Sequence, residues 1–338
     1  PPRCTNAAPT PPLPARLHLL AWERPSIYDE VGVLGTKSGG KPMPFDWESI
    51  VHPFAHPTPL SVAASLALFA LTLGLLERFF APRQREATGP RSRWLDLLYW
   101  FFTPLVTKFI TISVLARLLA CIFGQSLEEL ESYRNHGGSA QLPLGLQVGL
   151  VLLLGDFIHY WVHRLFHELD FLWPVHAIHH SPTELDWFSS MRMHPLNDLV
   201  TRVAQSLPLY LLGFSLEAIL LSVPIVSLVV IVSHTNVPWT FGPLRWVIVS
   251  PVYHQWHHSS EPEALDKNYA GMFPIWDVLF GTSYLPHGRL ACRFGCKSDQ
   301  PPEHLAGQLV HPFKVWTQMV RQHSMPTVPP TLIPGTEK

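Results

Sequence analysis

Residues 144–163 read LGLQVGLVLLLGDFIHYWVH, an apolar run whose second half carries Asp156, His159 and His163. A helix rises 1.5 Å per residue, so about 20 apolar residues cross a hydrocarbon core about 30 Å thick. Polar side chains at the end of such a helix indicate where it leaves the lipid or lines a site. The run from 144 to about 162 therefore predicts a membrane-crossing helix that carries histidines to a site near the membrane surface.

The composition also indicates a membrane protein. Only 14% of the 338 residues are charged, 47% are hydrophobic, and 12 are tryptophan, whereas an ordinary soluble domain has about 25% charged residues. The mean hydropathy is +0.15. The formal net charge is -1 and no Lys/Arg block is present, which excludes the electrostatic footprint of a nucleic-acid-binding protein.

Four more apolar segments have lengths that suit a membrane. They are residues 60–80, 97–123, 199–212 and 216–232. The first two are long enough to span. Gly213 and Pro224 interrupt the last two, which form either a tight pair of spans or a hairpin that dips into the membrane and returns.

The charged residues between the segments predict an orientation. The loop after the first segment is rich in arginine and the loop after the second is rich in glutamate, and the positive-inside rule places an arginine loop in the cytoplasm. The third segment then runs back toward the cytoplasm, which places all the histidine groups on the cytoplasmic face. The residues concerned are Arg83, Arg85, Arg91 and Arg93, followed by Glu128, Glu129 and Glu131.

Three regions are predicted along the chain. Residues 1–57 are rich in Pro and Gly, which predicts a disordered extension, with Met43 as the expected native start. Residues 58–290 form the membrane-embedded catalytic domain. Residues 291–338 hold an amphipathic helix, indicated by apolar residues at helical spacing from Leu305 to Val320, and then a disordered tail. The four cysteines are scattered and imply no disulfide framework.

Histidines recur at metal-ligand spacing. His159 and His163 are four residues apart, which places both imidazoles on one face of a helix. Two near-identical stretches, PVHAIHHS at 174–181 and PVYHQWHHS at 251–259, each carry the spacing H-x-x-H-H. A proline opens each stretch, as suits the first turn of a helix. Each triplet thus offers three ligands from one helical face: His176, His179 and His180 in the first, and His254, His257 and His258 in the second.

Eight histidines exceed the ligand demand of one metal ion, since a structural zinc takes about four ligands. The count therefore indicates two ions. Neutral imidazole binds zinc, copper, iron and nickel, so the ligand type alone does not select the metal. The chain has no H-E-x-x-H and no E-x-x-H motif, which leaves an all-histidine dinuclear site at a membrane surface.

These motifs resemble the fatty acid hydroxylase/sterol desaturase superfamily of membrane di-iron oxygenases. The resemblance rests on DFIHYWVHRLFH, PVHAIHH, SHTNVPW and VYHQWHH, followed by NYAGMFPIWDVLFGT, over residues 95 to 290. It implies two non-haem iron ions, molecular oxygen as co-substrate, a sterol or fatty-acyl type of lipid substrate and an external electron donor. The ligands that it implies are His159, His163, His176, His179, His180, His234, His254, His257 and His258.

The resemblance leaves several roles open. His194 matches a family position and is either a ligand or a residue that orients one, and His167 is expected to orient a ligand or to be structural. Pro238 stands where some relatives have another histidine, which leaves a tenth coordination position open to water or oxygen. Possible acceptors that orient ligands are Asp156, Asp186, Asn236 and Asp277.

The predicted fold is thus an all-α integral membrane bundle with a cytoplasmic, histidine-rich helical cap that holds a di-metal site. No flavin or nicotinamide motif is present, so electrons are expected from a cytochrome- or ferredoxin-type donor with its reductase, docked on Arg83 to Arg93. Two alternatives are a divalent-metal transporter, with ligands at mid-membrane depth, and a bis-histidine haem protein. No motif identifies the substrate or separates hydroxylation from desaturation.

Overall fold

Helices are the main regular structure in the part that the computed structural model describes, which comprises residues 56–82, 92–123, 138–296 and 300–324. Within these ranges no strand is present, and a single isolated bridge pairs Ser259 with Phe294. The all-α fold class is thereby confirmed. The N-terminal extension with Met43, most of the arginine and glutamate loops, and the C-terminal tail lie outside the described residues.

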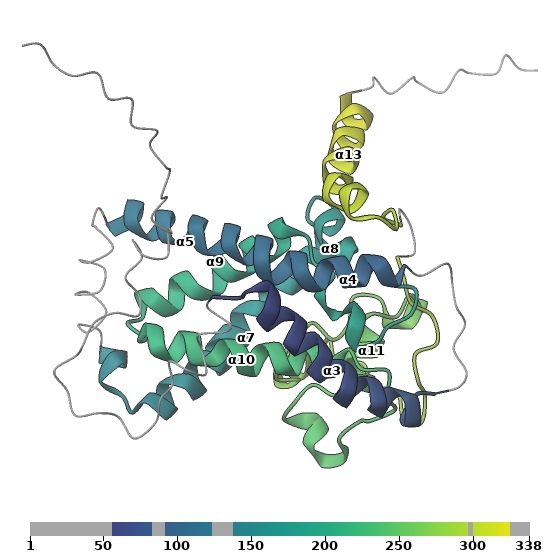
Figure 1. The fold of residues 1–338 in the computed structure, drawn as a ribbon, viewed down its shortest axis with the longest axis horizontal. Helices are drawn as coiled ribbons and strands as arrows, with labels where there is room; N and C mark the ends of the chain where they lie inside the picture. Colours follow the sequence, from purple (N-terminus) through teal and green to yellow (C-terminus); the bar gives the residue numbers. More distant parts are fainter. Residues whose placement is uncertain (1–55, 83–91, 124–137, 297–299, 325–338) are drawn as a thin grey trace, which may run out of the picture. The chain divides into compact units, whose positions relative to one another are not determined.

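Four helical segments are long and apolar enough to cross a bilayer. They are α3 (Pro59–Phe80), the continuous run Arg93–Ile122, α7 (Leu144–Glu168) and α10 (Leu216–Ser233). No more than 28% of the most apolar stretch of any of these segments is buried within the protein. Figure 1 shows α5 beside α9, and α7 packs against both α9 and α10. The helices predicted at 60–80, 97–123 and 144–162 are confirmed as candidate spans, although α7 continues six residues further than predicted.

Local sequence explains where these helices begin. Thr58 and Ser61 form a reciprocal capping box at the start of α3, and Ser215 accepts from the Ala218 N–H at the start of α10. Side-chain oxygens at these positions satisfy amide groups that have no partner within the helix. The helix boundaries therefore follow from local hydrogen-bonding chemistry as well as from hydropathy.

The second span contains a π-helical turn that the sequence did not predict. It consists of α4 (Arg93–Phe102), a π-helical turn η1 (Thr103–Thr107) and α5 (Lys108–Phe123). Pro104 lies in the turn, and proline removes one amide donor from a helix. The Thr103 hydroxyl donates to the Met191 carbonyl at 2.8 Å. The irregular turn is thus stabilised by the segment that follows the first histidine triplet.

Helix α9 (Pro195–Leu211) packs against α7 and α5. The Thr111 hydroxyl on α5 donates to Asp198 at 3.0 Å, and the Gln205 amide on α9 donates to the Gly155 carbonyl of α7 at 2.9 Å. At about 1.5 Å per residue its 17 residues extend about 25 Å. It is the partner of α10 in the predicted pair or hairpin, but it is too short to count among the four candidate spans.

One end of each candidate span lies near the histidine-rich site described below. Glu77, near the end of α3, accepts from the backbone N–H groups of Asn236, just after α10, and of Trp187. Asp96, near the start of α4, pairs with Arg192. Because α7 and α10 also end at histidines of the site described below, α3, α7 and α10 run toward the site and the second span runs away from it.

Short elements complete the region around these ends. They are α8 (Trp173–His180), η3 (Trp187–Met191), η4 (Gly242–Trp246), α11 (Pro251–His257), η5 (Pro262–Ala264) and α12 (Ile275–Leu279), with η2 (Gly138–Gln141) before α7. Helix α13 (Leu305–Ser324) confirms the predicted C-terminal helix and packs on α8 and α4. The Trp316 indole donates to the Phe171 carbonyl at 2.7 Å.

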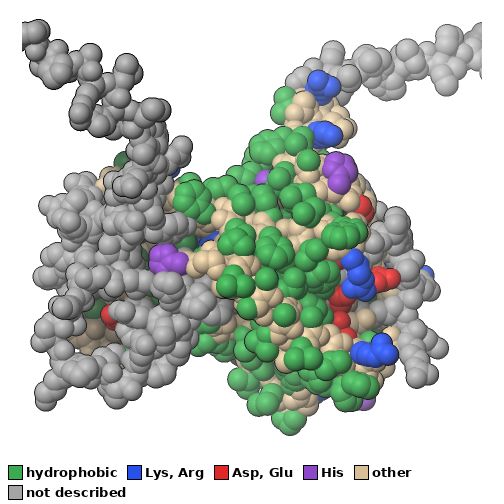
Figure 2. Space-filling model, in the orientation of Figure 1, with side chains coloured by type: hydrophobic (Ala, Val, Ile, Leu, Met, Phe, Trp, Pro, Cys, Tyr) green, Lys and Arg blue, Asp and Glu red, His purple; other side chains and the backbone are tan. Residues whose placement is uncertain are grey.

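Hydrophobic side chains cover much of the face drawn in Figure 2, and charged side chains gather along one side of it. On α3 alone, Leu68, Leu71 and Phe79 are exposed. Monomeric soluble proteins rarely expose contiguous apolar patches of more than a few hundred Å². The exposed apolar face agrees with an integral membrane protein.

Candidate metal centre

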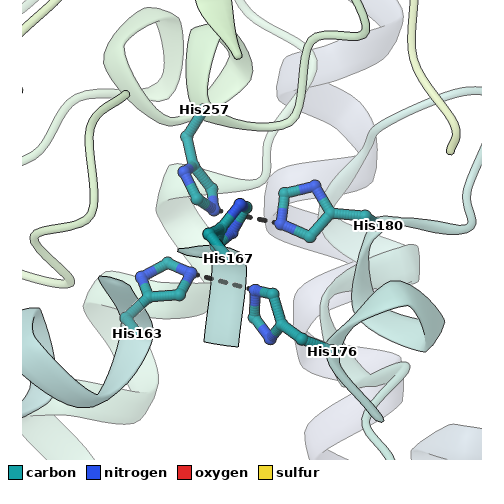
Figure 3. A group of neighbouring side chains, drawn as sticks. All are labelled: His163, His167, His176, His180 and His257. Atoms are coloured by element: carbon teal, nitrogen blue, oxygen red, sulfur yellow. Dashed lines mark hydrogen bonds between the residues drawn. The ribbon is translucent and has the colours of Figure 1, made fainter. Parts of the chain in front are cut away.

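Five imidazoles converge in a first group, shown in Figure 3. Helix α7 contributes two of them, α8 another two and α11 one, and one ligand nitrogen of each lies within 4.8 Å of those of the others. The members of group one are His163, His167, His176, His180 and His257. All lie at least partly buried. Three helices thus supply one cluster of imidazole nitrogen donors.

Four imidazoles form a second, fully buried group within the same distance limit. It is built from α8, from the residue that ends α10 and from α11 with its C-cap. The members of group two are His179, His234, His254 and His258. The rings of His180 and His258 stack with centroids 4.3 Å apart, so the two groups are neighbours.

The two groups explain why the chain repeats H-x-x-H-H. On α8 the first and last histidines of the triplet belong to group one and His179 belongs to group two. On α11 the assignment is reversed, because His257 belongs to group one and its two companions belong to group two. Each helix therefore lies between the groups and supplies a pair to one and a single histidine to the other, rather than three ligands to one site.

Hydrogen bonds at the outer ring nitrogen fix the tautomers. In His163, His179 and His234 the Nδ1 atom lies 2.7, 3.0 and 2.7 Å from the carbonyl oxygens of Tyr269, Arg192 and Val230. A carbonyl only accepts, so each Nδ1 carries the proton. In a neutral ring the Nε2 atom then presents a lone pair. These outer contacts resemble those that usually orient metal-binding histidines.

The bare nitrogens face one another. The Nε2 atoms of His179 and His234 are 3.3 Å apart, and those of His163 and His176 are 3.0 Å apart. The buried Nε2 of His167 has no hydrogen-bond partner. Two lone pairs cannot form a hydrogen bond with each other, whereas a cation between them would be bound by both. The residues of each group therefore fit a metal ion.

Burial favours the neutral rings that such a site needs. Desolvation lowers the pKa of His179 to about 4 and that of His234 to about 3, and it lowers the pKa of His257 well below its ordinary value of 6.5. A charged imidazole needs hydration that burial removes, and the neighbouring imidazoles oppose a second positive charge. The rings thus remain available as ligands well below neutral pH.

This burial predicts acid sensitivity of the metal-free protein. The unfolded chain binds protons at its histidines below about pH 6.5, whereas the buried rings of the folded protein stay neutral. Their contribution to the free energy of unfolding is therefore fully present above that pH and is lost as the pH falls toward 4. We expect the thermal midpoint in detergent to fall by on the order of 10 °C between pH 7.5 and 4.5. A pH-independent midpoint of the metal-free protein would contradict the predicted burial.

Two buried carboxylates hold the loop that orients group one. Asp277 accepts from the N–H groups of Tyr269 and Ala270, and Asp156 accepts from those of residues 271–273. This loop supplies the Tyr269 carbonyl to His163 and the Lys267 carbonyl to His257, the latter at 2.9 Å. The carboxylates therefore act on the imidazoles through backbone carbonyls.

We expect Asp277→Asn to weaken metal binding at group one by about 10- to 100-fold, the usual cost of losing an outer partner of a metal ligand. The amide NH2 of asparagine would face a backbone N–H group that now donates a hydrogen bond to the carboxylate. Metal titration of the purified protein provides the measurement. Group two serves as the internal control, because weakening of both sites to the same degree would indicate general unfolding instead.

The structure brings most of the predicted histidines into the two groups and leaves two of them outside. Eight of the nine predicted ligands lie in the two groups, together with His167. His159 lies outside both groups and packs against Gly271, where an added Cβ would approach its Cδ2 to 2.8 Å. His194 also lies outside the groups, since its Nδ1 accepts from the Leu196 N–H as the cap of α9 and its Nε2 donates to the Leu309 carbonyl.

The remaining polar candidates have local roles. Asp186 caps η3 by accepting from two of its N–H groups. Asn236 donates its backbone N–H to Glu77. Sequence reasoning missed Asn197, whose Oδ1 accepts from the Nδ1 of His176 at 2.8 Å. Its position three residues after His194 is the only sequence signal for it.

Comparison with known proteins agrees with this geometry. A model of the fatty acid hydroxylase family matches residues 148–282, an interval that contains both histidine groups. The ornithine lipid hydroxylase OlsE of Rhizobium tropici is 35% identical over 182 residues, which are 54% of this chain and 55% of OlsE. Residues 148–282 carry a fatty acid hydroxylase domain.

Two further proteins are similar over shorter stretches. The human alkylglycerol monooxygenase is 30% identical over 163 residues, 48% of this chain and 36% of that protein. A putative Delta(7)-sterol-C5(6)-desaturase 2 of Arabidopsis thaliana is 27% identical over 146 residues, 42% of this chain and 49% of that protein. The chain thus spans about half or less of the length of these relatives. No solved structure matches it.

Proposed function

We propose that this protein is a membrane di-iron oxygenase that uses O2 and external electrons to hydroxylate or desaturate a C–H bond of a lipid. The observation that carries the proposal is the pair of buried imidazole groups whose unprotonated nitrogens converge. The names of the relatives support a lipid as substrate, since they include an ornithine lipid hydroxylase and alkylglycerol monooxygenases.

The nine grouped histidines would hold two iron ions, and geometry favours His167 over His159 as the ninth ligand. Bound iron would supply, with O2, an oxidant strong enough for an unactivated C–H bond, which no side chain can provide. Hydroxylation of one C–H bond consumes one O2, two electrons and two protons and releases one water. Desaturation consumes the same reactants and releases two waters.

The chain's own residues would position and protect this centre. Backbone carbonyls of Tyr269, Arg192 and Val230 orient three rings, and Asp277 fixes the loop that carries one of those carbonyls. Burial excludes bulk water from group two. The groups lie at the ends of α7 and α10, so a lipid held beside these apolar helices could present a carbon without leaving the membrane.

The two alternative functions receive less support. A metal transporter would place polar ligands at mid-membrane depth in several spans, but both groups gather where α7 and α10 end. A bis-histidine haem site uses two axial imidazoles and would leave seven grouped histidines without a role.

We also propose that the histidine groups face the cytoplasm. The arginine-rich residues 83–91 join the ends of α3 and α4 that lie near the groups, and the positive-inside rule assigns such a loop to the cytoplasm. An electron donor of cytochrome or ferredoxin type would reach the centre from that side. Residues 58–290 would then form the catalytic domain, preceded by an N-terminal extension and followed by a C-terminal segment.

The test is isotopic. The purified protein is loaded with iron in nanodiscs made from a total bacterial lipid extract and supplied with ferredoxin, its reductase, NADPH and 18O2, and products are analysed by mass spectrometry. A lipid that gains one 18O atom, or loses two hydrogens, should appear with the unaltered protein and not with His257→Ala. Absence of any oxidised lipid from iron-loaded protein, over extracts that include sterols and ether lipids, would contradict the proposal.

A further inference from the structure

The loop between α10 and α11 exposes apolar side chains that no other part of the described chain covers. We call residues 238–248, PWTFGPLRWVI, the η4 loop. Leu244, Trp246 and Val247 are 59%, 58% and 58% exposed. The loop is drawn in green at the bottom of Figure 1, and hydrophobic side chains cover the same region in Figure 2. Its composition is thus unusual for a loop that faces only water.

The loop adjoins the end of a candidate span. Its Trp239 packs on Phe80, the last residue of α3, with ring centroids 5.6 Å apart. Phe79 and Phe80 are themselves exposed. The exposed apolar surface therefore continues from the end of a candidate membrane helix onto the loop.

The chemistry of the η4 loop suits the boundary between lipid headgroups and acyl chains. It carries two tryptophans and one cation and has no acidic residue. The Arg245 guanidinium lies over the Trp246 ring, 5.1 Å from its centroid. Tryptophan concentrates at this boundary, and arginine there attracts anionic headgroups.

The backbone of the loop limits how deep it can lie. Phe241 and Gly242 have left-handed φ angles of 60° and 55°, and only one short 3-10 turn, Gly242–Trp246, orders the loop. Irregular backbone exposed to the hydrocarbon core leaves amide groups without partners. Headgroup depth is compatible with this backbone because water and polar headgroups are available there.

We propose that the η4 loop is an interfacial membrane anchor, with Leu244, Trp246 and Val247 inserted at the headgroup level of the leaflet nearest the histidine groups. The loop is joined to the metal centre, because the Trp239 carbonyl accepts from the Val252 N–H of α11 and the Val249 N–H donates to the Met272 carbonyl. The anchor therefore sets the depth of α11, with its ligands His254 and His257, in the bilayer. The proposal requires membrane embedding but not oxygenase activity.

The test measures the depth of a spin label in nanodiscs that hold one chain each. Leu244→Cys and, separately, Val247→Cys are made in a chain whose four native cysteines are replaced by serine, and each is labelled with a nitroxide. The matched control keeps native Cys292, which is exposed on the segment before residue 297, as the sole cysteine. Metal content and a monodisperse elution profile verify that each variant is folded.

The labels at positions 244 and 247 should be at least several-fold more accessible to O2, relative to a water-soluble nickel chelate, than the label at Cys292. Accessibility to the nickel chelate equal to that at Cys292 would overturn the proposal. Shielding from both reagents would overturn it too, because the loop would then be covered by protein. All of these results are independent of lipid oxidation, so failure of the proposed function and failure of the anchor can be distinguished.

Discussion

Replacing His167 with alanine is expected to lower the metal content from two ions per chain to one and to abolish turnover. The buried Nε2 of His167 has no hydrogen-bond partner, and the centroid of its ring lies 4.9 Å from the ring centroids of His176 and His257. Loss of one donor from the group weakens the site and leaves a cavity that water can enter. Elemental analysis of the detergent-purified variant measures the loss.

The matched control is His159→Ala. His159 lies one helical turn before His163 on the same helix but outside both groups, so this variant should retain two ions per chain. The opposite pattern, in which His159→Ala loses an ion and His167→Ala retains both, would contradict the assignment of group one and restore the ligand pair predicted from the sequence.

Replacing Arg192 with methionine is expected to lower the free energy of unfolding by about 3–5 kcal/mol, the usual cost of breaking a buried ion pair. The Arg192 Nε atom lies 2.6 Å from Asp96, and both side chains are fully buried. Its Nη1 atom contacts Glu303 at 3.1 Å, which links α4 to the segment before α13. Methionine would remove the guanidinium from the buried Asp96 carboxylate. Guanidinium titration in detergent measures the change.

Two controls interpret that loss. Adding Asp96→Asn to the methionine variant should recover part of the stability, because it removes the buried negative charge that Arg192 balances in the unaltered protein. Arg202→Met breaks a half-exposed pair with Asp198 and should cost about 1 kcal/mol or less. Equal losses in the free energy of unfolding from Arg192→Met and Arg202→Met would contradict the prediction that the buried ion pair contributes more stability than the half-exposed one. The Arg192 carbonyl also orients His179, so weaker binding at group two should accompany the loss.

Hydropathy and proline positions predicted much of the fold. The apolar runs gave three of the candidate spans with nearly correct bounds, and Pro174 and Pro251 lie in the first turns of α8 and α11 as expected. The π turn was missed because Pro104 in a long apolar run does not reveal whether the helix ends or continues through an irregular turn. Hydropathy is insensitive to that distinction.

Spacing identified the histidines but not their partition. A separation of four residues places two rings on one face of a helix, and this holds for His159 with His163 and equally for His163 with His167. Which pair faces α8 depends on how α7 is rotated in the bundle, and that rotation is set by contacts with α9 and α10. Likewise, the division of each triplet between two groups follows from α8 and α11 lying between the groups, which is a tertiary arrangement.

Partners that act through the backbone leave no mark in a single sequence. Any residue type could supply the carbonyls that Tyr269, Arg192 and Val230 offer to the rings. Asp156 and Asp277 could be named as candidates because a carboxylate is a common outer partner of a metal-binding histidine. Their action through the loop at 269–273 became visible only in the folded chain.

The central claim is that two histidine groups form two metal sites, and anomalous X-ray scattering at the iron edge tests it most directly. Crystals of iron-loaded protein should give two separate peaks, one enclosed by His163, His167, His176, His180 and His257 and the other by His179, His234, His254 and His258. A single peak shared by the groups, or no peak within them in folded protein, would contradict the account.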